Sequence, residues 1–386
     1  MKGHYETFQI LHGLQNGYFD LSATTSNSFD ISSIKNVDID SKFEAIFGTF
    51  QASFVDYLSQ LEDVEYIEPN HIYRAPVLPA LVDPKPYVPS SMKPINNEQH
   101  QKRNLITQFN VPSWGLARVS HRDNDDLASY TYEDSFGHDI HVYIFDSGIE
   151  PTHPDFGGRA IMEANFIEYE GDTDLAGHGT HVAGTIGGNT FGIAKNVILH
   201  GVKILDATGE GRSSSLLQAI SYVIKKAERG RSLINLSLTG PPSQVIDDAL
   251  SMIVKQHGIP VFVSAGNTGN DACQYSPSAN PDVFVVGASD IDDTIPSFSS
   301  FGDCVRIYAP GTNITSSWLG GQSRSMQGTS MANPHVTGIA AILMSQYKFS
   351  KPSELYEAIK SSATQKILKQ SSHEDNSLKL LAYYGH

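Results

Sequence analysis

From residue 140 onward, short apolar runs alternate with segments whose apolar residues recur at helical spacing. The apolar runs are IHVYIF (140–145), VILHGVKIL (197–205), LINLSL (233–238), IPVFVSA (259–265) and DVFVVGAS (282–289). The helical patterns include SLLQAISYVIKKAE (215–228) and VIDDALSMIVKQ (245–256). Strands that are apolar on both faces need a cover on both faces, and amphipathic helices between parallel strands supply it. The sequence therefore predicts an α/β fold, a parallel sheet flanked by helices on both faces, with ligands bound at the carboxyl ends of the strands.

Length and charge narrow the class of protein further. A chain of 386 residues with 40% hydrophobic content can form one large domain and a smaller companion. Its 42 acidic and 27 basic residues give a formal net charge of -15, which repels phosphate backbones and anionic lipid. We therefore expect no nucleic acid and no membrane among its partners. No apolar run reaches the roughly 18 residues of a membrane span, and the first residues lack the apolar core of a secretory signal, which leaves a cytoplasmic protein or a missing start as alternatives.

Changes in composition divide the chain into four zones. Residues 1–73 end in AIFGTFQASFVDYLSQLEDVEYIEPNHIY, a strand, a helix and a second strand, which predicts a small α+β unit, while residues 1–40 show no opening strand or helix. Residues 74–112 are rich in proline and then polar, which predicts an exposed linker because successive prolines break helices and sheets. Residues 113–370 hold the α/β pattern, and residues 371–386 remain as a C-terminal tail.

Polar residues lie where the predicted strands end or the helices begin. Asp146 follows a strand in FDSGI, His178 lies in GHGTHVAGTIGG, and Ser330 precedes a buried helix in GTSMANPHVTGIAAILMSQ. Alone, the acid could cap a strand and the serine a helix. His178 and His181 do not match the zinc protease pattern, which needs a Glu beside the first His and a four-residue spacing.

Together these residues can supply one chemistry. A serine hydroxyl needs an imidazole to accept its proton and a carboxylate to orient that imidazole, roles that Ser330, His178 and Asp146 can fill. The oxyanion that forms on an attacked carbonyl needs a hydrogen-bond donor. Asn267, in VFVSAGNTGN, carries a suitable side-chain amide, although a Gly-Asn pair alone is more typical of a turn.

The segments around these residues match a known family. D-S-G at Asp146, G-H-G-T-H-V-A-G-T at His178, S-A-G-N at Asn267 and G-T-S-M-A-N-P-H at Ser330 resemble the subtilisin-like serine proteases, in that family's order. WGLARVSHRD, YSPSANPDVFVVGASD and SSFGDCVRIYAPGTNI are similar to the proteinase K branch, and most of all to the fungal vacuolar proteases related to cerevisin. The resemblance covers about residues 112–365.

The resemblance implies a subtilisin-like fold and a serine endopeptidase that acts on polypeptides, without a cofactor, as a monomer. It also implies that residues 1–73 are an inhibitor-type propeptide, with an N-terminal part that is divergent or incomplete, and that residues 74–112 carry the processing site. Vacuolar or secreted location follows from the same likeness. A catalytically silent protein with the same fold, which binds or regulates, is the alternative from another class; its site would be expected to have lost one of these residues.

The resemblance assigns further residues to the substrate cleft. In the family the substrate backbone lies beside an SLGG-like segment, which here is Ser237, Leu238, Thr239 and Gly240, and beside the segment of Ala265 and Gly266. Threonine in place of glycine at Thr239 either narrows the specificity pocket or turns to solvent.

Two more features depend on the same likeness. Some proteinase K relatives carry a disulfide at the spacing of Cys273 and Cys304, the two cysteines of the chain, and such a bond would indicate an oxidising compartment. In those relatives a calcium ion is held by the segment that corresponds to Pro281–Val283 and by an aspartate where this chain has Arg306, so we expect no metal there. We expect Arg306 to pair instead with a nearby acid, Asp282 or Asp303.

Two glycosylation acceptor patterns occur. Asn235, in NLS, belongs to a predicted apolar strand and should be buried, whereas Asn313, in NIT, follows a Pro-Gly turn and could be exposed. Short patterns of this kind often arise by chance, so they support a secretory route only weakly.

Overall fold

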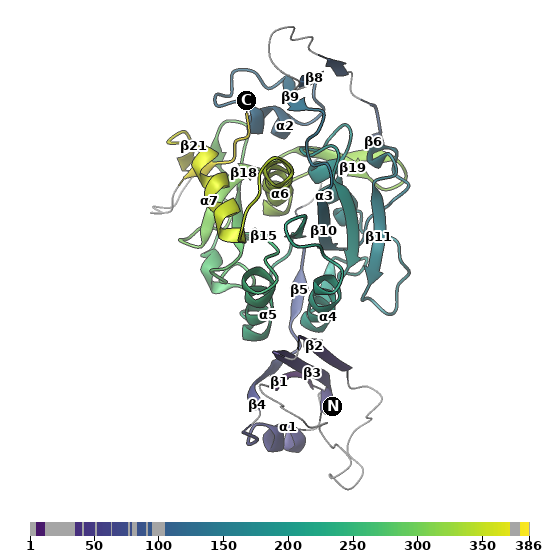
Figure 1. The fold of residues 1–386 in the computed structure, drawn as a ribbon, viewed down its shortest axis with the longest axis vertical. Helices are drawn as coiled ribbons and strands as arrows, with labels where there is room; N and C mark the ends of the chain where they lie inside the picture. Colours follow the sequence, from purple (N-terminus) through teal and green to yellow (C-terminus); the bar gives the residue numbers. More distant parts are fainter. Residues whose placement is uncertain are drawn as a thin grey trace.

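The computed structural model describes residues 5–11, 35–40, 42–50, 52–62, 64–75, 78, 83–89, 92–94, 105–370 and 379–385. A large α/β domain lies above a small N-terminal domain in the view of Figure 1. Among the helices of these residues, none is both long and apolar enough to cross a bilayer.

The large domain is built on one sheet in the strand order β11-β12-β10-β14-β15-β16-β18-β23-β21. Its strands are β10 (His141–Asp146), β11 (Ala160–Asn165), β12 (Ile198–Lys203), β14 (Ser232–Leu236), β15 (Val261–Ser264), β16 (Phe284–Ser289), β18 (Val305–Pro310), β21 (Thr364–Gln365) and β23 (Leu380–Leu381). All neighbours run parallel except β21 and β23. The predicted parallel sheet is confirmed. The predicted tail, 371–386, is not separate from the domain, because β23 joins this sheet.

Helices cover both faces of the sheet, as the sequence predicts. The helices are α2 (Trp114–Ser120), α3 (His178–Gly187), α4 (Ser213–Ile224), α5 (Gln244–Lys255), α6 (Thr329–Gln346) and α7 (Pro352–Ser362), with short 3-10 turns η3 (Pro154–Phe156) and η4 (Ala272–Gln274). Side chains of α4 and α5 pack on one face of the sheet, and those of α2, α3, α6 and α7 pack on the other. Two buried apolar layers result, which hold the strand ends in fixed positions.

The N-terminal domain is a sheet in the order β2-β3-β1-β4, antiparallel throughout, with one helix. Its elements are β1 (Tyr5–Leu11), β2 (Lys35–Ile39), β3 (Phe43–Phe50), α1 (Ala52–Leu58) and β4 (Val64–Pro69). The expectation that residues 1–40 lack an opening strand is wrong, since β1 lies inside the sheet. The last predicted strand is divided as well: β4 ends at Pro69, and β5 (Ile72–Arg74) pairs with β13 (Glu210–Arg212) of the large domain.

The proline-rich segment forms more strand pairs than its composition suggests. β6 (Lys85–Pro86) pairs with β20 (Gln322–Met326), which forms a hairpin with β19 (Ile314–Trp318). β7 (Met92–Pro94) and β8 (Leu105–Phe109) pair with each other, and β8 pairs with β9 (Ser129–Glu133). A two-strand ladder of β17 (Thr294–Ile295) and β22 (Lys369–Gln370) completes the list. The predicted exposure is found at Lys85, Pro86 and Val88. The expectation that successive prolines exclude sheet pairing is wrong for β6, β7 and β8, because prolines at strand ends and edges leave the partner strand's ladder intact.

Candidate active site

Asp146 is the last residue of the central strand β10, and its carboxylate is fully buried. Its carbonyl oxygen accepts hydrogen bonds from the amides of Ile204 and Leu205, which anchor the end of β10 to the residues that follow β12. Its Oδ1 accepts a hydrogen bond from the amide of Ser147 at 2.7 Å and lies 2.7 Å from Nδ1 of His178. The carboxylate is therefore fixed before any substrate arrives.

His178 is the first residue of α3 and is 2% exposed. Because Nδ1 faces a carboxylate, that nitrogen carries the proton and Nε2 is left as the acceptor. Burial by itself lowers the pKa of His178, but the charge and hydrogen bond of Asp146, with the charge of Asp174, outweigh it and raise this pKa. Nε2 has no hydrogen-bond partner among the described residues, as a general base awaiting a proton requires.

Ser330 is the second residue of α6, and it is fully buried. The turn before it needs Gly328, whose φ of 146° disfavours residues with a side chain. The hydroxyl of Ser330 donates to the carbonyl of Ser237 at 3.3 Å. Helix α3, which begins with His178, packs against α6, which carries Ser330 in its first turn. A turn of the Ser330 hydroxyl towards Nε2 is the change needed for proton transfer.

Asn267 follows β15 and is fixed by the residue before the serine. Its Oδ1 accepts from the amide of Thr329 at 2.8 Å and from the hydroxyl of Thr329 at 2.9 Å. The amide of Gly266 donates to the same hydroxyl at 3.1 Å. Because the oxygen end of the Asn267 amide is held in this way, the nitrogen end is the part that can donate to a substrate oxyanion.

The predicted cleft walls follow β14 and β15. Ser237, Leu238 and Gly240 are buried, and the hydroxyl of Ser264 reaches the carbonyl of Leu238 at 3.4 Å. Thr239 does not simply turn to solvent. Its Oγ1 lies close to Gly266, because a Cβ atom added to that glycine would be 4.0 Å away from it. The threonine hydroxyl therefore faces the Ala265–Gly266 wall, which favours the narrowed pocket.

The N-terminal domain fills the cleft beside this wall. Strand β5 runs antiparallel to β13, and Arg74 forms a pair with Thr239 in which N to O distances are 2.9 Å and 3.0 Å. The amide of Ala75 donates to the carbonyl of Gly209 at 3.0 Å. An extended peptide thus lies between strand β13 and the segment of Thr239 that follows β14, as an added strand of substrate would.

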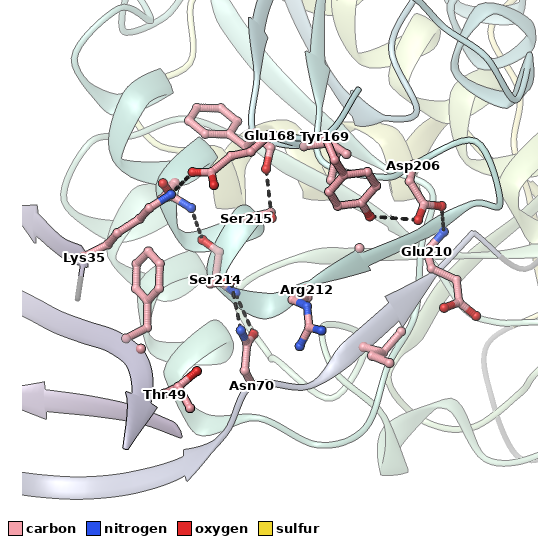
Figure 2. Close-up of a pocket in the computed structure, with 17 residues that line it drawn as sticks. Lys35, Thr49, Asn70, Glu168, Tyr169, Asp206, Glu210, Arg212, Ser214 and Ser215 are labelled. Carbon is pink, nitrogen blue, oxygen red and sulfur yellow. Dashed lines mark hydrogen bonds and ion pairs between the residues drawn. The ribbon is translucent and has the colours of Figure 1, made fainter. Parts of the chain in front are cut away.

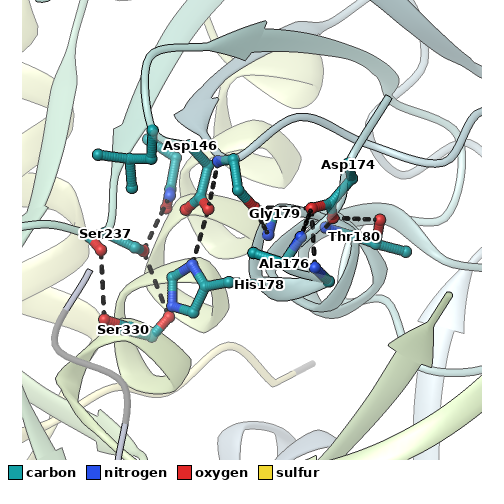
Figure 3. Close-up of polar contacts among 12 residues, drawn as sticks. Asp146, Asp174, Ala176, His178, Gly179, Thr180, Ser237 and Ser330 are labelled. Carbon is teal, nitrogen blue, oxygen red and sulfur yellow. Dashed lines mark hydrogen bonds and ion pairs between the residues drawn. The ribbon is translucent and has the colours of Figure 1, made fainter. Parts of the chain in front are cut away.

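Asp174 is a site residue that the sequence reasoning missed. This carboxylate is 5% exposed and accepts five hydrogen bonds from the residues that flank His178 and Asp146 (Figure 3). The donors are Ser147 Oγ, the amides of Ala176, Gly177 and Thr180, and Thr180 Oγ1, at 2.6 to 3.1 Å. The signal was present in the sequence, since an acid shortly before a helix is typical of an N-terminal cap.

Other predicted features lie further from this centre. Cys273 and Cys304 form a disulfide with a Cα–Cα distance of 5.6 Å. Arg306 makes no ion pair within the fully described stretch 105–370, and the expected partner Asp282 instead lies 2.7 Å from Lys255. Asn235 is buried, and Asn313 is exposed, as expected.

A hydrogen-bonded carboxylate and imidazole beside a serine at a helix start, on the carboxyl edge of a parallel sheet, is the arrangement of a serine hydrolase. The model of the Subtilase family, Peptidase_S8, matches residues 137–385. Subtilisin-like protease 6 of Trichophyton schoenleinii is 38% identical over 334 residues, which are 84% of this chain and 76% of that protein. A subtilisin-like protease of Coccidioides posadasii is 39% identical over 305 residues, 78% of this chain and 69% of that protein.

A solved structure agrees with these relatives. The crystal structure of a cold adapted subtilisin-like serine proteinase superposes with a TM-score of 0.66 and 35% identity, over 70% of this chain and 97% of that chain. The chain therefore belongs to the subtilase family and is a subtilisin-like serine endopeptidase.

Proposed function

We propose that this protease hydrolyses peptide bonds through an acyl-enzyme on Ser330. The Ser330 oxygen adds to the peptide carbonyl while its proton passes to Nε2 of His178, and Asp146 stabilises the imidazolium that forms. The tetrahedral intermediate then expels the amine, which takes that proton. Water repeats the two steps on the ester and restores the serine. The observation that carries this proposal is the buried Asp146–His178 hydrogen bond of 2.7 Å, with Nε2 lacking a partner.

Asn267 and the amide of Ser330 are the proposed oxyanion donors. Thr329 holds the Asn267 oxygen and so turns the amide nitrogen away from itself. Fixed donors at this place act on charge that develops only in the transition state. Loss of the corresponding donor in a subtilisin lowers kcat by about 10²- to 10³-fold. We expect Asn267→Ala to lower kcat by the same order with little change in KM.

We further propose that the N-terminal domain inhibits the enzyme as a propeptide. Strand β5 occupies the cleft, and two polar residues just before it cap helices of the large domain. Glu68 accepts from Ser243 Oγ at 2.5 Å and from the amides of Gln244 and Val245, at the start of α5. Asn70 accepts from the amide of Ser214 at 3.2 Å, at the start of α4. Both side chains supply acceptors that a helix N-terminus lacks.

The contact between the domains leaves a pocket beside β5 (Figure 2). This cavity of about 380 Å³ is lined by Asn70 and Ile72 from one side and by Tyr169, Asp206 and Glu210 from the other. Arg74 lies 2.7 Å from Glu210 beside this pocket. We propose that Glu210 favours a basic residue where a substrate carries the equivalent of Arg74, with a small effect because both side chains are exposed to solvent.

Self-processing completes the proposed function. We propose that the chain is cut between about His100 and Pro112, because exposed backbone without ladder bonds can enter a protease cleft. Leu105–Phe109 is strand β8, which leaves 100–104 and 110–112 for the cut. Residues 100–104 lie outside the described residues and contain the dibasic Lys102–Arg103 pair, so a separate processing enzyme is the alternative. The Cys273–Cys304 bond supports a vacuolar or secreted location, since such bonds persist in oxidising compartments.

Two measurements test this function. A fluorophosphonate probe should label Ser330 in the processed protein and not in Ser330→Ala. The same variant, made in a host without related proteases, should accumulate as the uncut chain. Normal maturation of Ser330→Ala would disprove self-processing, and absence of probe labelling in processed protein would favour a catalytically silent protein.

A further inference from the structure

The segment Asp83–Pro89 docks on the large domain at a place separate from the cleft strand β5. Lys85 and Pro86 add a third strand to the β19–β20 hairpin, with Lys85 opposite Ser323 and Pro86 opposite Gln322. In this small sheet the order is β19-β20-β6, and Figure 1 shows β6 at its edge, whereas β5 lies where the two domains meet. The chain thus touches the large domain twice, before and after residues 76–82.

Tyr87 is the anchor of this second contact. Its hydroxyl lies 2.9 Å from Oγ1 of Thr190, and its ring meets the rings of His153 and Phe191 edge to face, at centroid distances of 5.6 Å and 6.1 Å. Burial raises the pKa of Tyr87. The next residue, Val88, is 71% exposed, so the contact is specific to the tyrosine.

The surface under Tyr87 is joined to the catalytic residues. His153 lies 2.8 Å, through Nε2, from the carbonyl of Gln322 in β20. The hairpin is tied in turn to α3, because Nε2 of His181 contacts the carbonyls of Ile314 and Arg324 at 3.0 Å and 3.1 Å. Helix α3 begins with His178, and a Cβ on Gly177 just before it would lie 2.6 Å from the ring of Trp318 in this hairpin.

We propose that Asp83–Pro89 is a second anchor of the inhibitory propeptide, and that the surface of His153, Thr190, Phe191 and the β20 edge is its docking site. Two contacts on one chain raise the effective concentration of each for its site, so loss of either weakens both. A cut after this segment leaves the propeptide held at two places, and the enzyme stays latent until both release. The inference rests on the proposed inhibition by the N-terminal domain.

The first test measures docking without any cleavage. In full-length Ser330→Ala, hydrogen exchange is followed at 83–89 and 322–326, with Tyr87→Ala, Tyr87→Phe and, as the matched control, Val88→Ala. We expect faster exchange in both segments for Tyr87→Ala, a smaller increase for Tyr87→Phe, which keeps the ring, and none for Val88→Ala. Unchanged exchange in Tyr87→Ala would overturn the second anchor.

The second test measures inhibition. In chains with Ser330 intact, the same substitutions are made and the rate at which peptidase activity appears is recorded. The loss of one hydrogen bond and the ring contacts should raise this rate about tenfold in Tyr87→Ala. Faster exchange with an unchanged rate would show docking without inhibition and overturn the proposal. If no variant processes itself, self-processing fails, while the exchange comparison still decides the docking.

Discussion

The two domains are stabilised in different ways. The large domain buries two apolar layers on its own sheet, and its site residues lie at strand and helix ends between them. Among the side chains that the structure describes in the N-terminal domain, Phe50 and Leu58 form a separate buried cluster, with Val55, Leu61 and Ile67 packed against it. Other buried side chains of this domain, such as Ile39 and Phe47, belong to the apolar layer of α4 and α5.

This difference has a functional consequence. A domain that borrows its apolar core is marginal alone, because a small chain buries too little surface to offset its conformational entropy. Folding of the N-terminal domain is therefore coupled to its binding to the large domain. Such a domain can bind the enzyme tightly and still unfold once it is detached. An unfolded inhibitor does not bind again, which makes its removal permanent.

The largest expected effect concerns this dependence. We expect residues 1–75, made alone, to be unfolded, and to gain structure when the Ser330→Ala large domain is added. Circular dichroism and amide dispersion in NMR measure the change. A fragment that folds cooperatively by itself would contradict this dependence. Phe47→Ala in the full chain, which leaves a cavity in the shared layer, should lower stability by about 3 to 5 kcal/mol.

The disulfide adds to the stability of the large domain. The bond of Cys273 to Cys304 closes a separation of 31 residues, for which loop entropy gives about 3 to 4 kcal/mol. We expect Cys273→Ser, Cys304→Ser and the double variant to lose similar stability, in chemical unfolding of the large domain. Two free thiols in native protein from its own cell would contradict the bond.

Asp174 tests how far the buried polar groups set catalysis. We expect Asp174→Asn to lower kcat roughly 10- to 100-fold, since charge-assisted hydrogen bonds to α3 weaken, with little change in KM. The Asp174 charge raises the pKa of His178, so its removal lowers that pKa. Because His178 must be neutral to accept a proton, the acid limb of kcat/KM should move to lower pH. Asp172→Asn, at an exposed neighbour, is the control; an unmoved acid limb would leave Asp174 with a structural role alone.

The sequence predicted the large domain well because its signals are local. Apolar runs and helical periods matched β10, β12, β14, β15 and β16 within a few residues, and sequence order brought Asp146 and His178 to one edge. Contacts made at a distance were missed. Nothing near Lys85 marks it as a partner of Ser323. A local cap signal could have found Asp174, but not its hydrogen bond from Ser147 Oγ. Proline content predicted an open linker, since composition does not show which edge is available to a strand.

Glu68 tests, with a smaller expected effect, what holds the N-terminal domain on the large domain. Loss of its contacts to the start of α5 should weaken the complex by about 1 to 2 kcal/mol, the usual range for a helix cap with a favourable charge. Glu68→Ala should therefore release active enzyme several-fold faster, and Glu62→Ala, at an exposed position, should not. Equal rates for the two would show that β5 and the shared apolar layer hold the domain without this cap.

The smallest expected effect is that of a chelator on the large domain. Calcium prefers several oxygen ligands and negative charge, but Arg306 brings a guanidinium to the position where relatives of this type are expected to supply a carboxylate. The carboxylate of Asp282 is engaged by Lys255 at 2.7 Å. Calcium present at 100 times the Kd of a site would raise the free energy of unfolding by about 2.7 kcal/mol, which shifts Tm by several degrees. We therefore expect the same Tm with EDTA and with calcium. A fall in Tm with EDTA that calcium reverses would contradict this expectation. In that case, Arg306→Asp should strengthen the calcium dependence of Tm only if the ion binds at this segment.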